Sequence, residues 1–288
     1  MTLLYLRSTV LLEVPVTRTT ARPWAVPGLS PGGPGTATAA LDPAWSSWTG
    51  PHGGLLAALL LRTGQTLSPQ DQEPQALTVQ FLAATGGDTA LLAAEVVRSG
   101  RSSSVVAATL RDRDGALTTT ATLTSGRRRA GATWAGVPAP AVPDPDDLGP
   151  LELPVELVPF GQHLEYRPVG AHPLSGGATP SLLCWVRLRD GGNYDAAALA
   201  LLVDVLPPAL YGATTTPVPV PTVELSVLLS GAPTASGWVL TRTATRSAQD
   251  GWCVDDVEVW DGAGRLLAQS RQLRRVLGDL PLPGGSAA

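Results

Sequence analysis

The sequence has 288 residues, of which 44% are hydrophobic and 15% are charged, and its formal net charge is −4. This composition supplies enough apolar side chains for a sizeable core, argues against a disordered chain and gives no indication of a nucleic-acid partner. No apolar stretch reaches the roughly 18 residues of a membrane span, and the two cysteines form no CxxC or Cys/His cluster for a metal. We therefore expect a soluble cytoplasmic protein without a metal site.

Residues 1–35 form an N-terminal extension that precedes the first regular pattern. Its apolar start is interrupted by Arg7 and is followed by no small-residue cleavage site, so we do not expect a signal peptide. Pro and Gly are frequent in residues 15–35, which is typical of a poorly ordered segment.

The first half of the chain predicts one helix among several strands. Residues 54–66 contain no helix breaker before Gly64 and are apolar almost all round, which predicts a helix that is buried on nearly every side. Turn signals, of which Asp114-Gly115 is the strongest, separate segments rich in Val, Thr and Leu. The predicted strands of this half are 36–41, 76–83, 89–98, 103–111 and 116–125.

Residues 127–160 break this pattern and become rich in Pro and Asp, which predicts a linker that packs over the surface. The second half then repeats the order of the first. The segment from Asn193 to Asp195 offers a cap for a second apolar helix over residues 196–206, which Pro207 and Pro208 end. The predicted strands of this half are 182–188, 222–229, 237–246, 252–260 and 265–276.

Short motifs of the first half recur in the second. Leu77-Thr78-Val79 returns 148 positions later as Leu225-Ser226-Val227, and Arg98-Ser99 returns as Arg246-Ser247. A tandem duplication explains this spacing, and two copies favour a closed pseudo-dimer over a solenoid. We therefore expect one unit at 36–126, the linker at 127–160, a second unit at 161–277 and a tail at 278–288.

Three polar residues of the second half are candidates for chemistry. Asp204 is the only ionisable side chain of the second predicted helix, where burial of a lone carboxylate is costly unless it is paired or functional. Thr222 opens a strand and Gln272 lies in an unusually polar last strand. The alternatives are an Asp204 that faces solvent or hydrogen-bonds a nearby loop, an ordinary strand Thr and an outward-facing edge strand. Ser270 has no base near it in the sequence, which lowers its prospects as a nucleophile.

The motifs LALLVDVLPPAL, VPTVELSVLL and WDGAGRLLAQSRQL resemble the C-terminal half of type II acyl-CoA thioesterases and their relatives, and GPHGGLLAALLLRTG resembles the companion half. The resemblance implies an α+β double hotdog, in which each of two tandem units has a central helix wrapped by an antiparallel sheet. It also implies that Asp204, Thr222 and Gln272 orient a hydrolytic water, with Asp204 as the general base, that acyl-CoA is the partner and that no cofactor takes part.

A tetrahedral intermediate on a thioester needs hydrogen-bond donors for its oxyanion. Gly53 and Gly54 open the first predicted helix, where backbone N–H groups are free and the helix dipole is positive. The same glycines could simply permit close packing at the helix start, and both interpretations stay open. Hotdog proteins use a helix start in this role, so the resemblance implies an active site that combines residues of both halves. We expect one such site per chain, because the first predicted helix contains no acidic residue.

Two other functions stay open for the sequence. One is a hotdog protein that binds acyl-CoA or another acyl ligand without turning it over. The other is a dehydratase, whose chemistry needs a His base close to an acid. His52 is the candidate base, but it has no carboxylate beside it in the sequence and is more typical of a satisfied or surface histidine. A homo-oligomer is a possible assembly for any of these functions.

Overall fold

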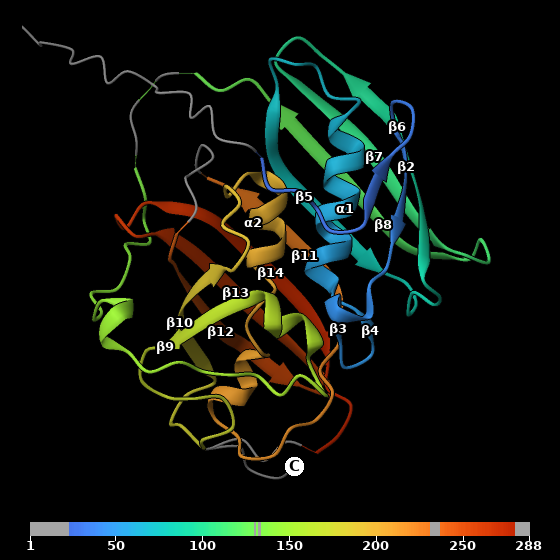
Figure 1. Cartoon of the computed structure of the whole chain (residues 1–288). Coiled ribbons are helices and arrows are strands. Elements are labelled where there is room, and N and C mark those ends of the chain that lie inside the picture. Colours follow the sequence, from blue (N-terminus) through green and yellow to red (C-terminus); the bar gives the residue numbers. More distant parts are fainter. Residues whose placement is uncertain (1–22, 130, 132–133, 231–236, 280–288) are drawn as a thin grey trace, which may run out of the picture.

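The computed structural model describes residues 23–129, 131, 134–230 and 237–279. Within these ranges, 12 antiparallel strands form a large sheet in the order β1-β2-β6-β7-β8-β5-β11-β14-β13-β12-β10-β9, and a separate pair, β3-β4, forms a short ribbon. The sheet curves around helices α1 and α2, which lie side by side on its inner face (Figure 1). The expected α+β arrangement of two helices wrapped by antiparallel strands is confirmed.

The predicted strands and the first predicted helix are found with small changes at their ends, whereas the short strands at 29–31, 46–47, 50–51 and 164–168 were not predicted. The helices are α1 (Gly53–Gln65) and α2 (Ala196–Leu202). The strands of the first unit are β1 (Leu29–Pro31), β2 (Thr36–Ala40), β3 (Ser46–Ser47), β4 (Gly50–Pro51), β5 (Glu73–Phe81), β6 (Thr89–Ser99), β7 (Ser103–Asp112) and β8 (Leu117–Gly126). The strands of the second unit are β9 (Leu164–Pro168), β10 (Ser181–Leu188), β11 (Thr222–Leu229), β12 (Val239–Gln249), β13 (Trp252–Asp261) and β14 (Leu266–Arg275). Short 3-10 helices are η1 (Pro43–Trp45), η2 (Pro145–Asp147), η3 (Pro159–His163) and η4 (Ala209–Gly212).

The two units join where β5 pairs with β11. In this pair Thr78 lies opposite Ser226, Leu77 opposite Val227 and Val79 opposite Leu225. The two copies of the repeated motif therefore pair antiparallel with each other, and the local two-fold axis passes between Thr78 and Ser226. The duplication thus builds a closed pseudo-dimer, because each copy covers the sheet edge of the other.

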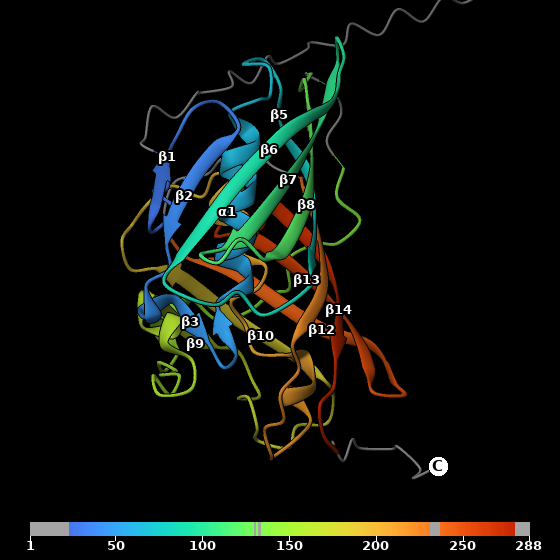
Figure 2. The ribbon, with the colours of Figure 1, turned by 90° about the vertical axis from the view of Figure 1, so that its right-hand side faces the viewer.

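Helix α1 lies across the inner faces of β6, β7 and β8 (Figure 2). Its residues from Leu55 to Leu61 are at most 4% exposed, and each fully buried leucine contributes roughly 1.5–3 kcal/mol through the hydrophobic effect. The apolar surface all round the helix is covered by the sheet on one side and by α2 on the other. Neither α1 nor α2 is long and apolar enough to cross a membrane.

Helix α2 is shorter than the sequence predicted. It ends at Leu202 rather than near residue 206, so Asp204 lies in the turn that follows the helix. Pro207 explains the early end, since its ring would clash with the carbonyl group of Val203 and it has no N–H to donate to that group. The carbonyl groups of the turn are therefore free to bond to other parts of the fold.

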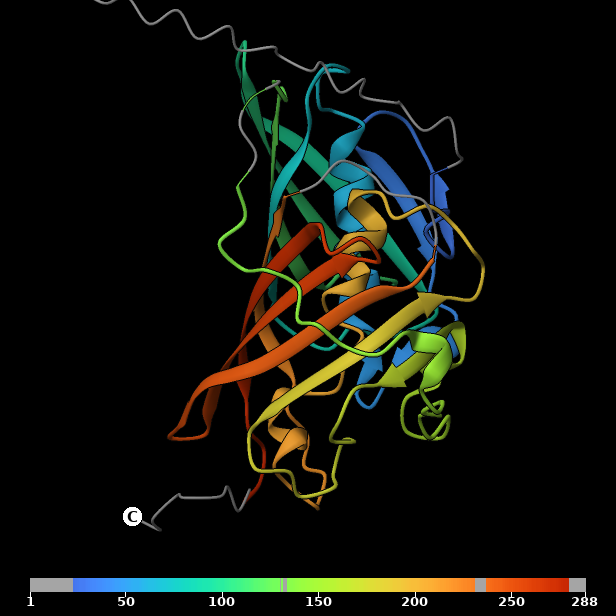
Figure 3. The ribbon, with the colours of Figure 1, turned by 90° about the vertical axis from the view of Figure 1, so that its left-hand side faces the viewer.

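The linker packs over the outer face of the second unit, as Figure 3 shows. Two indole groups fix it there. Trp260 Nε1 donates to Val137 O at 3.1 Å, and Trp185 Nε1 donates to Pro143 O at 3.0 Å. Trp260 is fully buried, although it belongs to a face of β13 that would otherwise contact solvent.

The expectation of a poorly ordered segment up to residue 35 is wrong for residues 23–35; residues 15–22 lie outside the described part of the chain. Leu29–Pro31 pair with β2, and Trp24 is 2% exposed. Trp24 Nε1 donates to Asp190 Oδ2 at 2.9 Å, which attaches the extension to the second unit. Local sequence pattern does not predict this contact, because Asp190 is 166 positions away.

Candidate functional site

Asp204 lies where the start of α1 meets the end of α2. Its Oδ2 accepts a hydrogen bond from Gly54 N at 2.8 Å, and its Oδ1 accepts one from Gln272 Nε2 at 3.2 Å. The Asp204 side chain is 9% exposed and lines a pocket. The alternative of a carboxylate pointing into bulk solvent does not hold.

Side chains from three other elements bond to the turn that carries Asp204. The carbonyl groups of three successive residues, freed by the early end of α2, each accept one hydrogen bond. The pairs are Gln272 Nε2 to Val203 O at 3.2 Å, His52 Nε2 to Asp204 O at 3.0 Å and Tyr166 OH to Val205 O at 3.2 Å. The backbone under Asp204 is therefore fixed from β14, from the start of α1 and from β9.

Gln272 connects Asp204 to Thr222. Thr222 Oγ1 donates to Gln272 Oε1 at 3.1 Å, while both amide protons of Gln272 are spent on Asp204 Oδ1 and Val203 O. Gln272 is fully buried and faces inward in a central strand, so it is not on an outward-facing edge. Thr222 and Asp204 line the pocket and keep acceptor lone pairs, whereas Gln272 holds the two in place.

His52 contacts the same carboxylate. It is 3% exposed, its ring lies 4.0 Å from that of Phe160, and its Nε2 is 3.6 Å from Asp204 Oδ2. Burial lowers the pKa of His52, and the negative charge of Asp204 opposes this only in part. In the neutral ring Nε2 carries the proton that Asp204 O accepts, and Nδ1 has no hydrogen-bond partner among the described residues. No carboxylate lies beside His52 in the sequence, but the fold brings the Asp204 carboxylate next to it.

A second charged pair lies beneath Asp204 and was missed in the sequence. Arg274 Nη2 is 3.6 Å from Asp204 Oδ1, and Arg274 Nε is 3.1 Å from Asp255 Oδ2. Arg274 is 6% exposed and Asp255 is fully buried. One sequence signal was present: Asp255 alternates with Cys253 and Val257, so strand periodicity places its carboxylate on the inner face.

The two glycines at the start of α1 have different roles. Gly54 N–H donates to Asp204, so it is already engaged. Gly53 N–H, at the first helical position, has no partner in the described structure, and Gly53 lines the pocket. A Cβ on Gly54 would lie 2.9 Å from Leu201 O, so close packing also requires glycine there.

The pocket has a volume of about 620 Å³, which is the size of a site for a small organic ligand. Asp204, Thr222 and Arg274 lie between a wall from the first unit and a wall from the second. The first wall comes from residues 47–53, Leu56, Phe81 and 83–85; the second from Pro173, Leu174, 206–208, Tyr211, Pro217 and 219–223; residues 151–154, 157–158 and 160 close the third side. Both units and the linker therefore build the site.

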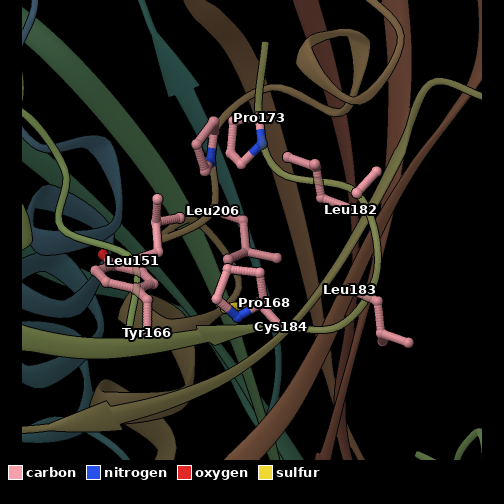
Figure 4. A pocket seen from close by; sticks show the side chains of 10 residues that line it. Leu151, Tyr166, Pro168, Pro173, Leu182, Leu183, Cys184 and Leu206 are labelled. Carbon is pink, nitrogen blue, oxygen red and sulfur yellow. The ribbon is translucent and has the colours of Figure 1, made fainter. Parts of the chain in front are cut away.

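A smaller cavity of about 10 Å³ lies beside this pocket and shares Leu151, Pro173, Leu206 and Pro207 with it. Figure 4 shows apolar side chains around it, with Cys184 beneath Leu206. Burial raises the pKa of Cys184 to about 12, so its thiol stays protonated and unreactive near neutral pH. Within the described ranges, no three His, Cys, Asp or Glu side chains gather as metal ligands would.

Comparisons with known proteins match both halves of the chain. Residues 41–126 match a family model described as the acyl-CoA thioesterase N-terminal domain, and residues 137–276 match the acyl-CoA thioesterase C-terminal domain. An uncharacterized protein of Mycobacterium tuberculosis is 29% identical over 260 residues, which cover 80% of this chain and 88% of that protein.

Solved structures show the same fold. A conserved protein of unknown function with a hot dog fold from Alicyclobacillus acidocaldarius is 28% identical, with a TM-score of 0.81 over 87% of this chain and 96% of that chain. An acyl-CoA thioesterase II from Mycobacterium marinum is 19% identical and has a TM-score of 0.69 over 90% of this chain and 97% of that chain, a likeness of fold alone. The double hotdog expected from the sequence is confirmed.

Proposed function

Since the chain belongs to the acyl-CoA thioesterase family, we propose that it hydrolyses an acyl-CoA thioester to the free acid and coenzyme A. The observation that carries this proposal is the Asp204 carboxylate, which is fixed by Gly54 N–H and the Gln272 amide and lines the pocket beside Thr222. A carboxylate held in this way can take a proton from a water molecule in the pocket.

The water binds between Asp204 and Thr222. It donates one hydrogen bond to the carboxylate and one to Thr222 Oγ1, whose own proton is directed to Gln272 Oε1. These two hydrogen bonds leave a lone pair of the water to face the thioester carbon. The roles therefore differ from the sequence expectation in one respect, since Gln272 acts on the water through Asp204 and Thr222.

The reaction proceeds by direct attack of this water. Its oxygen forms a bond to the thioester carbon while Asp204 accepts the proton, and Gly53 N–H stabilises the oxyanion. The carbon–sulfur bond then breaks, and the coenzyme A thiolate takes the proton that Asp204 holds. Ser270 does not line the pocket, and neither cysteine does, which favours water over a covalent enzyme intermediate.

The walls of the pocket indicate how the substrate lies. The second-unit wall contains prolines and leucines and has few hydrogen-bonding groups, which suits the acyl chain. The first-unit wall carries Ser47, Thr49 and Thr85, which suits the amide groups of the pantetheine arm. The thioester then lies between the walls, beside Asp204.

One observation favours a second candidate, a dehydratase. His52 and Asp204 lie 3.6 Å apart at the pocket, so an acid and a histidine are both present. However, His52 Nε2 donates its proton in a hydrogen bond to Asp204 O, so this nitrogen cannot accept a proton from a substrate. An unsaturated acyl-CoA separates the two reactions, because hydrolysis releases a thiol and hydration removes the conjugated double bond without releasing one.

The test is thiol release from acyl-CoAs of increasing chain length by the wild type, Asp204→Asn and Asp114→Asn. Asp114 is exposed in the turn between β7 and β8, so Asp114→Asn makes the same chemical change away from the pocket. We expect Asp204→Asn to lose roughly 10²-fold or more in kcat and the control to match the wild type. Undiminished activity of Asp204→Asn rejects the proposed base. Binding without thiol release from any acyl-CoA identifies a non-catalytic acyl-ligand protein.

A further inference from the structure

Arg274 and Asp255 lie directly behind the candidate base, and no step of the hydrolysis described above uses them. We propose that Arg274 is a positioning residue, which Asp255 holds beside Asp204 so that the Asp204 carboxylate stays ionised while one of its lone pairs remains open to water. This inference rests on the proposed function, because it assigns a means of controlling the same carboxylate.

Asp255 is a fixed anchor for the guanidinium group. Its Oδ1 accepts a hydrogen bond from Thr245 Oγ1 at 2.7 Å, and its Oδ2 accepts one from Ala209 N at 3.3 Å. The ion pair with Arg274 Nε, at 3.1 Å, therefore joins Arg274 to a carboxylate that cannot turn. Arg274 Nη1 also donates to Val220 O at 3.4 Å, which fixes the other side of the group.

The position of Nη2 matters because it is close to Asp204 without bonding to it. The distance of 3.6 Å to Asp204 Oδ1 is within reach of charge attraction but beyond a hydrogen bond. A closer approach would make a strong charge-assisted bond and occupy the oxygen that water needs. The ion pair with Asp255, at 3.1 Å, competes for the same cation and opposes this approach.

The charges also explain why Arg274 is needed. Two buried carboxylates, Asp204 and Asp255, share this one cation, and without it their repulsion and burial would favour protonation of one of them. A protonated Asp204 cannot act as a base. Thr222 pairs with Arg274 across β11 and β14, and both residues line the pocket together with Asp204.

The other titratable groups around Asp204 do not replace this cation. His52, from the start of α1, is neutral because burial lowers its pKa. Tyr211, from η4, and Cys253, from β13, have pKa values raised to about 12 by burial and stay protonated near neutral pH. Glu152, from the linker, lines the pocket but is exposed. Arg274 is thus the one permanent cation among the described residues that line the pocket.

The test compares three variants by two measurements. Asp255→Asn removes the anchor, and the double variant Arg274→Gln/Asp255→Asn removes both members of the ion pair, so that neither is left without the other. Arg275→Gln is the matched control, because Arg275 is exposed and stacks on Trp252. The measurements are the acid limb of the kcat/KM profile against pH and the pKa of Asp204 by carboxyl NMR, with Asp204→Asn used to assign the signal.

We expect the two variants to shift in opposite directions. In Asp255→Asn the freed Arg274 moves into hydrogen-bond contact with Asp204. The acid limb therefore moves to lower pH, the pKa of Asp204 falls and the plateau value of kcat decreases. In the double variant the acid limb moves to higher pH and the pKa of Asp204 rises, because the cation 3.6 Å from Asp204 Oδ1 is lost, and the simultaneous loss of the repelling Asp255 carboxylate offsets only part of this rise. The control should superpose on the wild type.

Shifts in the same direction, or no shift in either variant, overturn the inference. The NMR measurement keeps it separate from the proposed function. If the wild type releases no thiol, hydrolysis is rejected while the carboxyl pKa values still decide the role of Arg274. If hydrolysis occurs and the pKa values do not move, the inference fails alone. Arg274→Lys, which keeps the charge, should retain the wild-type acid limb if charge is the cause.

Discussion

Arg62 Nη2 lies 2.6 Å from Asp195 Oδ2, where the last turn of α1 meets the N-cap of α2. At the opposite end of the same antiparallel helix pair, Gly54 N–H donates to Asp204 Oδ2. Each end of this helix pair thus joins the start of one helix to the end of the other. The first end is closed by this ion pair and by Trp24 O, which also accepts from Arg62, whereas the second end opens into the pocket. One end of the pair therefore serves stability and the other carries the candidate site.

Asp195→Ala separates these two roles. Asp195 Oδ1 accepts from Ala197 N and Ala198 N, so the substitution removes an N-cap and leaves Arg62 without its ion pair. We expect the free energy of unfolding to fall by about 1–2 kcal/mol. Urea denaturation measures this loss, and thiol release should be unchanged at a temperature where both proteins are folded. A loss of activity as large as that of Asp204→Asn would contradict the separation.

Two glycines of α1 should respond differently to the same substitution. A Cβ on Gly54 would lie 2.9 Å from both Leu201 O and His52 Cε1, and backbone cannot move aside easily, so Gly54→Ala should cost about 1–3 kcal/mol and displace Asp204. A Cβ on Gly64 would meet Leu123 at 3.4 Å, an ordinary contact, so Gly64→Ala should stabilise the helix by up to about 1 kcal/mol. Thermal unfolding and thiol release of both variants check this contrast. Equal effects would show that close packing at the start of α1 is not required.

The sequence predicted the elements that local pattern determines. The longer strands and the buried helix α1 follow from residue pattern, and the closed pseudo-dimer follows from the repeated motif around Thr78 and Ser226. The short strands β1, β3, β4 and β9 were not predicted. The early end of α2 was missed although Pro207 explains it, because an apolar run favours helix and the clash involves a residue four positions earlier.

The partners of Asp204 were less predictable for a different reason. They come from residues 150 and 68 positions away, and nothing local in the sequence states which side chains reach one turn. The resemblance supplied Thr222 and Gln272 but not His52, Arg274 or Asp255, which become visible only when three elements pack against the end of α2. Charged residues at inward positions of β13 and β14 are the pattern to look for.

The buried imidazole of His52 makes stability depend on pH. Burial lowers the pKa of His52 below its ordinary value of 6.5, so the unfolded chain binds a proton at a pH where the folded chain does not. Above about pH 6.5 the imidazole is neutral in both states, so His52 does not lower the free energy of unfolding. As the pH falls from 6.5 through the pKa of the folded state, the free energy of unfolding decreases. The loss is on the order of 1 kcal/mol for each pKa unit of lowering.

Urea denaturation at about pH 7.5 and about pH 5.5 measures this dependence. His52→Gln should lose less stability between these two pH values than the wild type, because it has no group to protonate. His172→Gln, at an exposed position, is the control and should follow the wild type. If His52→Gln and the wild type lose the same free energy, protonation of His52 does not contribute.

Leu174 lines the second-unit wall of the pocket in a backbone conformation that leucine rarely adopts. Its φ is 61°, in the left-handed region, which costs roughly 1–2 kcal/mol for a residue with a Cβ. Its N–H donates to Tyr211 O at 2.6 Å, which holds the strained turn against η4. Such strain persists where the surrounding structure enforces it, and here it directs an apolar side chain to the wall assigned to the acyl chain.

Leu174→Gly and Leu174→Ala distinguish the strain from the size of the side chain. Both remove bulk from the wall, so kcat/KM measured over a series of acyl-CoAs should move toward longer or bulkier chains in both. Only glycine also removes the backbone strain, so Leu174→Gly should unfold at a higher temperature than Leu174→Ala by the equivalent of about 1 kcal/mol. An unchanged chain-length profile in both variants would mean that the acyl chain does not reach this wall, and the two walls of the pocket would then exchange their assigned roles.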